Sequence, residues 1–325
     1  MIRRKPRSAS KNGSQAEPLS GPTKTAATRH TRRFFPKLEP TTAEMTGFSN
    51  LTERKNLWPW LLLTPLAVFL LVFFVVPLID VAVMSFTEPR VTFANYERAL
   101  TGGLYQRVFI NTFLTAGFVT LCCLLTGYPL AYLMSVSSQR TAMLILLLVT
   151  MSFWTSFLVR TYAWMVLLGT NGPLVWIFQA IGITKPPQLL FTRFSSTLAM
   201  VHILAPYMIM NIYSVMRKID PVLVRSAESL GARGGSLLRH VYLPLTAPGI
   251  ANGCVLVFVI CLGFYVTPVL LGSPREQMIA GLIGTQLDEF LAFGMGSALA
   301  MVLLVVTMVI LTIYHRRFGL DKLWG

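Results

Sequence analysis

The chain has 325 residues and a formal net charge of +15, because 28 lysines and arginines outnumber 13 aspartates and glutamates. It is also 54% hydrophobic and only 13% charged, which is about half the charged fraction of an ordinary soluble domain. This composition excludes an intrinsically disordered protein. It also argues against a soluble nucleic-acid-binding protein, whose basic charge covers a polar surface. A membrane protein with one basic side remains.

Residues 1–56 differ in composition from the rest of the chain. They contain twelve lysines and arginines and four glutamates among many serines, threonines, prolines and glycines. Such a segment buries too little apolar surface to fold alone, so we expect a disordered basic cytoplasmic tail. We favour a solvated tail over one that binds nucleic acid or anionic lipid. A membrane domain, 57–318, and a short cytoplasmic C-terminus, 319–325, are expected to follow.

Six stretches are long and apolar enough to cross a bilayer, which takes about 20 residues as a helix. Prolines in or near them are tolerated in a bundle, where neighbouring helices satisfy the freed carbonyl groups. The sequence therefore predicts an all-α integral membrane protein with six transmembrane helices in contact with lipid. The predicted spans are Leu57–Ile79, Ile110–Met134, Ala142–Leu168, Ser195–Val215, Gly249–Leu271 and Leu291–Ile313.

The positions of the basic residues indicate the direction of the chain. If the N-terminus is cytoplasmic, the inner segments hold 21 lysines and arginines and the outer segments hold six. Cytoplasmic loops carry the basic excess in membrane proteins, so both termini are expected in the cytoplasm. The inner segments are 1–56, 135–141, 216–248 and 314–325, and the outer segments are 80–109, 169–194 and 272–290.

Several motifs of enzymes and carriers are missing from the sequence. It contains no P-loop pattern, no HExxH, no CxxC and no GxSxG, so no enzyme activity and no cofactor are expected in this chain. Its four cysteines lie in apolar runs without metal-ligand spacing, and we interpret them as free, small hydrophobic residues. The predicted spans also lack buried carboxylates, which argues against an ion-coupled secondary transporter.

The cytoplasmic loop 217–248 carries the most informative pattern. Asp220 and Pro221 form a helix start, with a capping carboxylate followed by proline at the first helical position. A semi-apolar face follows at helical spacing, and Gly231 permits a sharp turn out of the helix. A second amphipathic stretch, Leu237–Leu243, is expected to end at Pro244. An exposed, partly apolar helix here is normally a docking surface. Its face consists of Val222, Leu223, Ser226, Ala227 and Leu230.

This loop resembles the EAA loop in permease subunits of bacterial ABC importers. The family pattern is Glu-Ala-Ala, three residues, Gly, nine residues, Ile or Val, one residue, and Leu-Pro. Arg225 stands where the family usually has Glu, and Ser226 stands where it has the first Ala. These departures put the family's glutamate contact to the ATPase in doubt. The residues that match at the family's spacing are Ala227, Gly231, Val241, Leu243 and Pro244.

Three further segments resemble the spermidine/putrescine-type permeases of this family. The resemblance covers about residues 57–318 and implies the type I importer fold, in which two six-helix subunits frame a path. It implies ATPase subunits that hold ATP and Mg²⁺, a second and non-identical permease, and a periplasmic substrate-binding protein, with no nucleic acid. The substrate would be a polyamine or a similar small organic solute. The segments are Asn111–Thr112 with Gly127–Tyr132, Phe153–Trp164 and Gly263–Gly272.

The resemblance also implies a coupling site. Residues 221–235 would form the coupling helix and its turn, which transmit ATPase movement to the spans. We expect Ala227 and Gly231 to allow close packing, and Arg225 and Glu228 to make polar contacts. The candidate coupling residues are Arg225, Ser226, Ala227, Glu228, Gly231, Val241, Leu243 and Pro244.

Arg160 lies inside the third predicted span, where an arginine costs on the order of 3 kcal/mol on insertion scales. Two roles stay open for it: a structural one at the outer gate, or contact with the substrate path. In the path, a lone arginine would repel a polyamine, and an anionic or zwitterionic solute would suit it better. Trp154, Tyr162 and Trp164 are the other candidate path residues, with an interfacial aromatic belt as the alternative.

Two other classes of function stay open beside the inner-membrane importer subunit. One is a secondary transporter or channel that is not driven by ATP. The other is a non-transporting membrane scaffold whose basic tail recruits nucleic acid or lipid. ATP-dependent uptake by a complex with an ATPase would separate the importer from both alternatives.

Overall fold

The computed structural model describes residues 57–183 and 187–318. The predicted tail, 1–56, and the predicted C-terminus, 319–325, lie outside these residues. The chain divides into two compact units, Met1–Leu63 and Thr64–Gly325. Everything said below about packing concerns the second unit. Within the described residues every regular element is a helix, as predicted.

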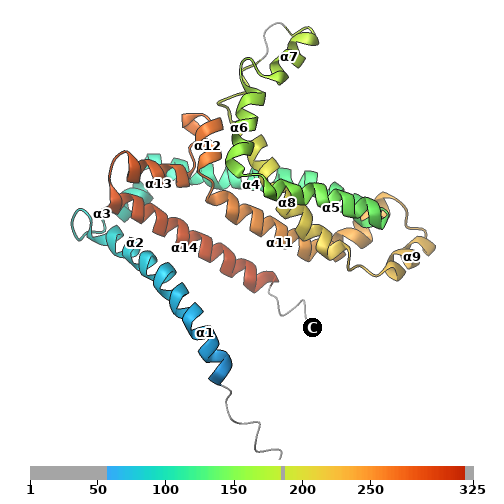
Figure 1. Ribbon diagram of the computed structural model, residues 1–325, viewed down its shortest axis with the longest axis horizontal. Helices are drawn as coiled ribbons and strands as arrows, with labels where there is room; N and C mark the ends of the chain where they lie inside the picture. Colours follow the sequence, from blue (N-terminus) through green and yellow to red (C-terminus); the bar gives the residue numbers. More distant parts are fainter. Residues whose placement is uncertain (1–56, 184–186, 319–325) are drawn as a thin grey trace, which may run out of the picture. The chain divides into compact units, whose positions relative to one another are not determined.

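The helices follow one another along the chain with short connections (Figure 1). They are α1 (Leu57–Leu70), α2 (Val76–Thr87), α3 (Ala94–Thr101), α4 (Gly103–Val136), α5 (Gln139–Trp154), α6 (Phe157–Leu168), α7 (Pro173–Ala180), α8 (Arg193–Met216), α9 (Pro221–Ser229), α10 (Gly235–Leu237), α11 (Leu243–Leu262), α12 (Val266–Leu271), α13 (Ile279–Asp288) and α14 (Phe293–Phe318), with the π-helical turns η2 (Leu71–Val75) and η3 (Leu238–Tyr242) and the 3₁₀ turn η4 (Pro274–Glu276).

Among the described residues, five helices are long and apolar enough to cross a membrane, and a sixth span is counted if one bent pair is taken together. The prediction of six spans is confirmed in this sense. The five helices run over Leu63–Thr87, Gly103–Val136, Arg193–Met216, Gly235–Leu262 and Phe293–Arg316, and the bent pair consists of Gln139–Trp154 and Phe157–Ala180.

The third predicted span, Ala142–Leu168, is wrong as a continuous helix. The chain bends by 96° between the helix that ends at Trp154 and the one that begins at Phe157. Thr155, between them, has extended backbone angles, with φ −88° and ψ 134°. Its hydroxyl donates to the carbonyl of Ser152 at 3.0 Å, so a side chain takes over a carbonyl that the next helical turn would have used.

The fifth predicted span, Gly249–Leu271, is also interrupted. Helix α11 ends at Leu262, and the amide of Gly263 closes its last turn on the carbonyl of Ile260 at 3.2 Å. Pro268 lies in the following short helix, and because proline lacks an amide hydrogen it cannot extend the α11 ladder. The span is therefore two helices, α11 and α12, separated by residues 263–265.

The predicted helix stop at Pro244 is wrong as well. The chain stays helical from Gly235 through Pro244 to Leu262. The π-helical turn η3 lies directly before this proline, and η2 lies before Pro77 in the same way. A proline removes one backbone donor, and a wider turn is a common way for a helix to accommodate the break in its ladder.

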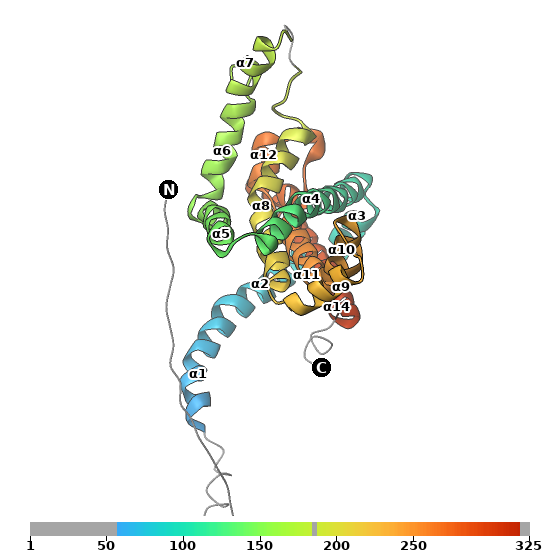
Figure 2. The ribbon, with the colours of Figure 1, turned by 90° about the vertical axis from the view of Figure 1, so that its right-hand side faces the viewer.

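Helix α8 is the central helix of the second unit and packs against both α4 and α11 (Figures 1 and 2). Glycines on α4 and α11 allow these two helices to lie close to α8. A Cβ on Gly249 of α11 would lie 2.9 Å from Val215 Cγ2, and one on Gly253 would lie 2.7 Å from Met208 Sδ. On α4, a Cβ at Gly127 would lie 3.2 Å from Met208 Cγ. Small residues of this kind let membrane helices pack closely.

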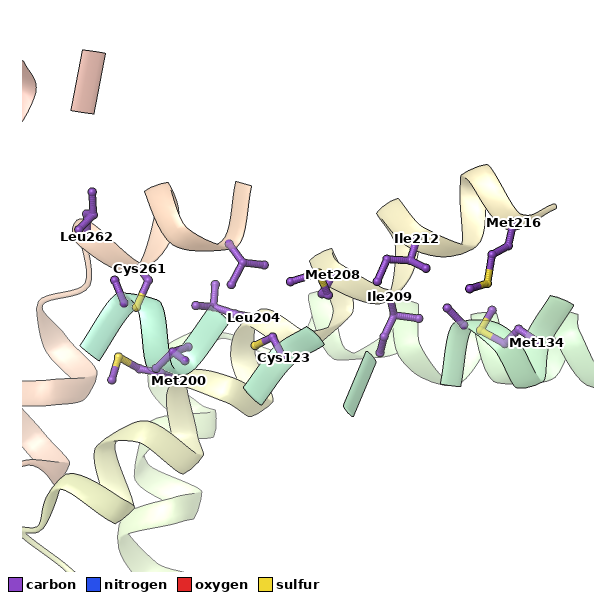
Figure 3. Close-up of a cluster of buried hydrophobic side chains, with 14 of the residues drawn as sticks. Cys123, Met134, Met200, Leu204, Met208, Ile209, Ile212, Met216, Cys261 and Leu262 are labelled. Carbon is purple, nitrogen blue, oxygen red and sulfur yellow. The ribbon is translucent and has the colours of Figure 1, made fainter. Parts of the chain in front are cut away.

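The core between these three helices is rich in sulfur (Figure 3). Methionine side chains are flexible and fill irregular gaps, and buried cysteines behave as small hydrophobic groups. All four cysteines are free, which confirms the interpretation from sequence. The labelled core residues are Cys123, Met134, Met200, Leu204, Met208, Ile209, Ile212, Met216, Cys261 and Leu262.

Candidate functional site

Helix α9 lies in the loop between α8 and α11, near the end of α8 (Figure 1). Its first turn is held by Asp220, whose side-chain oxygen accepts a hydrogen bond from the amide of Val222 at 2.8 Å. Pro221 follows at the first helical position, where its missing amide hydrogen costs nothing. The helix start predicted at these two residues is confirmed.

The other end of α9 is closed by a Schellman turn at Gly231. This residue has a φ of +91°, which glycine adopts without the steric cost that a side chain brings. The Gly231 amide donates to the carbonyl of Glu228 at 3.0 Å, and the Ala232 amide donates to the carbonyl of Ala227 at 3.0 Å. These bonds satisfy the last carbonyls of the helix. Both ends of α9 are thereby set by short-range hydrogen bonds.

The surface of α9 is exposed although much of it is apolar. All nine residues of this helix are described, and none is buried. Leu230, directly after it, is 90% exposed, and Val222 is 60% exposed. The hydroxyl of Ser226 donates back to the carbonyl of Val222 at 2.8 Å. An exposed apolar helix with internally satisfied hydroxyls has the character of a docking surface.

The eight candidate coupling residues fall into two groups along the chain. Arg225, Ser226, Ala227 and Glu228 lie on α9, and Gly231 follows it, whereas the remaining three lie on η3 and the start of α11. Arg225 lines a cavity of about 310 Å³ where α9 faces the ends of α4, α5 and α8. Tyr242, at the end of η3, lines the same cavity. The three residues on η3 and α11 are Val241, Leu243 and Pro244.

The opposite ends of α4 and α8 are tied to η4 and to the start of α13. Arg193 Nη2 donates to Asn111 Oδ1 at 2.5 Å, and Arg193 Nε lies 3.6 Å from Glu276 Oε1. The amide of Ile279 donates to the hydroxyl of Thr112 at 2.8 Å in a buried position. Sequence reasoning missed Arg193 and Glu276 because they are far apart along the chain, although Asn111 and Thr112 belong to a segment that it singled out.

This arrangement agrees with the predicted division of the connecting segments into two sets at opposite ends of the spans. Residues of the predicted inner segments 135–141 and 216–248 line the 310 Å³ cavity together. Residues of the predicted outer segments 169–194 and 272–290 form the Arg193–Glu276 ion pair at the other end. Neighbouring spans therefore alternate in direction, as a multi-pass membrane protein requires.

A second cavity, of about 480 Å³, lies where the break between α5 and α6 and the break between α11 and α12 meet α8. Backbone that departs from helix is tolerated inside a membrane only where it is buried in protein or lines a cavity. Two helix breaks at one cavity are consistent with that rule. Its charged and aromatic lining residues are Arg160, Phe153, Phe157, Tyr207, Phe264 and Tyr265.

Of the four candidate path residues, Arg160 lines this cavity and the other three do not. Trp154 is 89% exposed, and Tyr162 is also exposed. Trp164 donates its indole hydrogen to His202 Nδ1 at 3.2 Å. Sequence reasoning found the arginine from its rarity inside a span, but it missed Tyr207, which no local pattern marks.

Comparison with known proteins places these features in a family. Residues 124–319, which include the α9 loop and both helix breaks, match the family described as binding-protein-dependent transport system inner membrane component. The chain belongs to this family. Its members are permease subunits of ABC importers, so the family predicted from the loop is confirmed.

This permease is similar to several curated permeases. It is 34% identical to the spermidine/putrescine transport system permease protein PotB of Haemophilus influenzae, over 70% of this chain and 79% of that protein. It is 32% identical to PotB of Escherichia coli, over 71% of this chain and 84% of that one. It is 28% identical to the inner membrane ABC transporter permease protein YdcU of E. coli, over 74% of this chain and 80% of that protein.

Solved structures show the same fold. A chain of a bacterial ABC transporter involved in the import of the acidic polysaccharide alginate matches with a TM-score of 0.66 at 20% identity, over 83% of this chain and 98% of that one. A chain of the bacterial alginate ABC transporter in complex with an alginate pentasaccharide-bound periplasmic protein matches with a TM-score of 0.69, over 82% of this chain and 96% of that one. The predicted type I importer permease fold is confirmed.

The permease is therefore a multi-pass protein of the bacterial inner membrane. ATP hydrolysis belongs to separate subunits, which also bind the nucleotide, and the permease carries no cofactor of its own. Membership of a binding-protein-dependent family implies an ATPase, a second permease and a periplasmic binding protein as partners.

Proposed function

We propose that this permease forms one half of a path for a small organic solute, and that α9 is its coupling helix. The observation that carries the proposal is the combination of an unburied, partly apolar helix with ends held by a side-chain cap and a Schellman turn. A rigid, exposed helix of this kind can seat in a groove of an ATPase and pass its movement to α8 and α11.

We further propose that the solute is a polyamine or a similar small organic molecule. The support is the identity of 32 to 34% to PotB permeases, whose names specify spermidine and putrescine. We also propose a non-identical second permease, so that the path is framed by two different chains. Residues 57–318 would form the membrane domain, with the basic tail outside the transport machinery.

The coupling role is tested by replacing Gly231 in the assembled importer. Nothing lies within 4 Å of a Cβ on this residue, but its φ of +91° strains any side chain. Gly231→Ala and Gly231→Trp are therefore expected to distort the turn after α9 without blocking membrane insertion. Solute-stimulated ATP hydrolysis and uptake in proteoliposomes should both fall by about tenfold or more for Gly231→Trp.

Gly235→Ala is the matched control in the same loop. A Cβ there also meets nothing within 4 Å, and Gly235 has no positive φ. This variant should retain uptake close to that of the unchanged permease. Normal uptake by Gly231→Trp would contradict the assignment of α9 as the coupling helix, and uptake without ATP or an ATPase would contradict the importer itself.

A further inference from the structure

A groove of about 500 Å³ lies between α5 and the last turns of α8, on the side of the molecule that carries α9 (Figure 1). We call it the α5–α8 groove. Leu146 of α5 and Met210 of α8 form its apolar part, and Met210 is 37% exposed. The hydroxyl of Ser214, also in the lining, donates to the carbonyl of Asn211 at 2.8 Å. A hydrocarbon chain can therefore occupy the groove without leaving this hydroxyl unpaired.

The groove changes from apolar to basic along one face of α8. Met210, Tyr213 and Arg217 are three and four positions apart and all line the groove, so they lie one above another on the same side of the helix. The seven positions from Met210 to Arg217 span about 10 Å at 1.5 Å per residue. Tyr213 lies between the two, where a tyrosine suits the boundary between hydrocarbon and headgroups.

The basic end of the groove consists of two adjacent cations, Arg217 and Lys218. Both are exposed and directly follow the last residue of α8. The amide of Arg217 donates to the carbonyl of Tyr213 at 2.9 Å, so its backbone continues the α8 ladder. Neither side chain makes an ion pair with a described residue. A guanidinium and an ammonium group are thus available together for one anion.

The described residues supply no anion at this place. The α5–α8 groove has no aspartate or glutamate in its described lining. The neighbouring cavity of about 310 Å³ shares Tyr213 and Arg217 with the groove, and its described lining has none either. Asp220, the nearest acid along the chain, caps α9 by accepting from the amide of Val222. An anion that neutralises the two cations would therefore come from outside the chain.

An apolar groove with paired cations at one end matches the chemistry of an anionic phospholipid. Basic pockets between membrane helices on the cytoplasmic side bind anionic headgroups. Arginine also pairs with phosphate through two parallel hydrogen bonds. A zwitterionic headgroup carries its own cation beside the phosphate, and two protein cations would repel that group.

We infer that the α5–α8 groove binds an anionic phospholipid at the predicted cytoplasmic end of the spans. An acyl chain lies against Leu146 and Met210, and the phosphate pairs with Arg217 and Lys218. This inference goes beyond the proposed function, and it depends neither on the solute nor on the coupling role of α9.

The test titrates lipid onto the full-length permease assembled with its partner subunits in detergent, and native mass spectrometry counts the bound lipids. The probes are phosphatidylglycerol and phosphatidylcholine with the same acyl chains. Phosphatidylglycerol should bind about tenfold or more tightly. Glycerol 3-phosphate, which is the headgroup chemistry without acyl chains, should not displace it.

Charge variants test the basic end of the groove. Arg217→Gln and Lys218→Gln should each weaken the binding of phosphatidylglycerol by about fivefold, and neither should change the binding of phosphatidylcholine by more than about twofold. Arg316→Gln is the matched control, because Arg316 is an exposed arginine at the predicted cytoplasmic end of another span, α14, and does not line the groove. It should bind phosphatidylglycerol as the unchanged permease does.

A size variant tests the apolar part. Met210→Trp fills the groove and should weaken the binding of phosphatidylglycerol by about fivefold or more. Met308→Trp is its control, because Met308 is an exposed methionine of α14 outside the groove. That variant should leave lipid binding unchanged.

Equal affinities for the two lipids would overturn the inference, and so would equal losses in Arg217→Gln and Arg316→Gln. Displacement by glycerol 3-phosphate would reduce the site to one for a free phosphate. Failure of Met210→Trp to assemble with the second permease would assign the groove to that subunit, and the lipid site would then be wrong. ATP-driven uptake is measured separately, and its absence would contradict the proposed function without changing the comparison of lipid affinities.

Discussion

Val215 of α8 and Gly249 of α11 are in contact so close that a Cβ on the glycine would lie 2.9 Å from Val215 Cγ2 and 3.0 Å from its Cβ. The valine side chain is branched at Cβ and cannot swing away easily. The contact therefore holds the first turns of α11 against the last turns of α8, on either side of the loop that carries α9.

Gly249→Ala is expected to destabilise the permease. Alanine favours a helix over glycine by about 1 kcal/mol, whereas overpacking a tight contact costs about 1–3 kcal/mol. The cost of overpacking should exceed the gain in helix propensity, so the thermal unfolding midpoint in detergent should fall. The control is Gly117→Ala on α4, where a Cβ meets nothing within 4 Å. That variant should keep or raise the midpoint, and a fall of the same size in both would contradict the packing argument.

Asp220→Ala should loosen the start of α9. Loss of an N-cap costs about 1 kcal/mol, and here the lost contact is the 2.8 Å hydrogen bond from the Val222 amide. We expect lower solute-stimulated ATP hydrolysis with an unchanged amount of assembled complex. Asp220→Asn keeps the capping oxygen and is expected to retain most of the stimulated rate. Equal losses in the two variants would point to the charge of Asp220 instead of its cap.

Leu230→Asp should weaken the association with the ATPase. Leu230 is almost fully exposed, so its replacement leaves the permease fold without a lost core contact. A charged group at an apolar docking position costs desolvation when the partner seats. Co-purification of the ATPase should fall by about tenfold or more. Leu104→Asp, another exposed leucine that lies at the start of α4, should leave co-purification unchanged.

Thr112→Val should destabilise the end of the molecule opposite α9. The valine keeps the shape of threonine but leaves the buried amide of Ile279 without its acceptor. An unsatisfied buried donor costs about 1–3 kcal/mol, which should lower the unfolding midpoint. Thr126→Val on the same helix is the control, because the Thr126 hydroxyl bonds only within α4. A midpoint that is unchanged in Thr112→Val would contradict the importance of this tie.

Deletion of residues 1–50 should leave uptake close to normal. The match to the permease family begins at residue 124, and the first apolar helix begins at Leu57. The measurement is ATP-driven uptake at equal amounts of assembled complex. A loss of uptake at normal assembly would assign the basic tail a role in transport.

Local signals in the sequence are sufficient to predict the ends of α9. Asp220 and Gly231 act through hydrogen bonds to residues within a few positions, and Pro221 acts through its fixed backbone angle, so their effect on α9 can be predicted without tertiary information. The spans follow in the same way from the length of their apolar stretches, and the direction follows from the distribution of lysine and arginine.

The two helix breaks and the tie at the opposite end were not predictable in this way. Hydrophobicity averaged over a span does not register Thr155 or Gly263, because both lie in apolar surroundings that suit a continuous helix equally well. The Arg193–Asn111 hydrogen bond joins residues 82 positions apart. The packing of α4 against α8 brings them together. The hydrophobic periodicity of either segment does not predict this contact.

The nine residues of α9 form a helix about 14 Å long at 1.5 Å per residue. A side-chain cap at one end and a Schellman turn at the other define where this helix begins and ends. If α9 is the coupling helix, as proposed, the groove that receives it has to match this length.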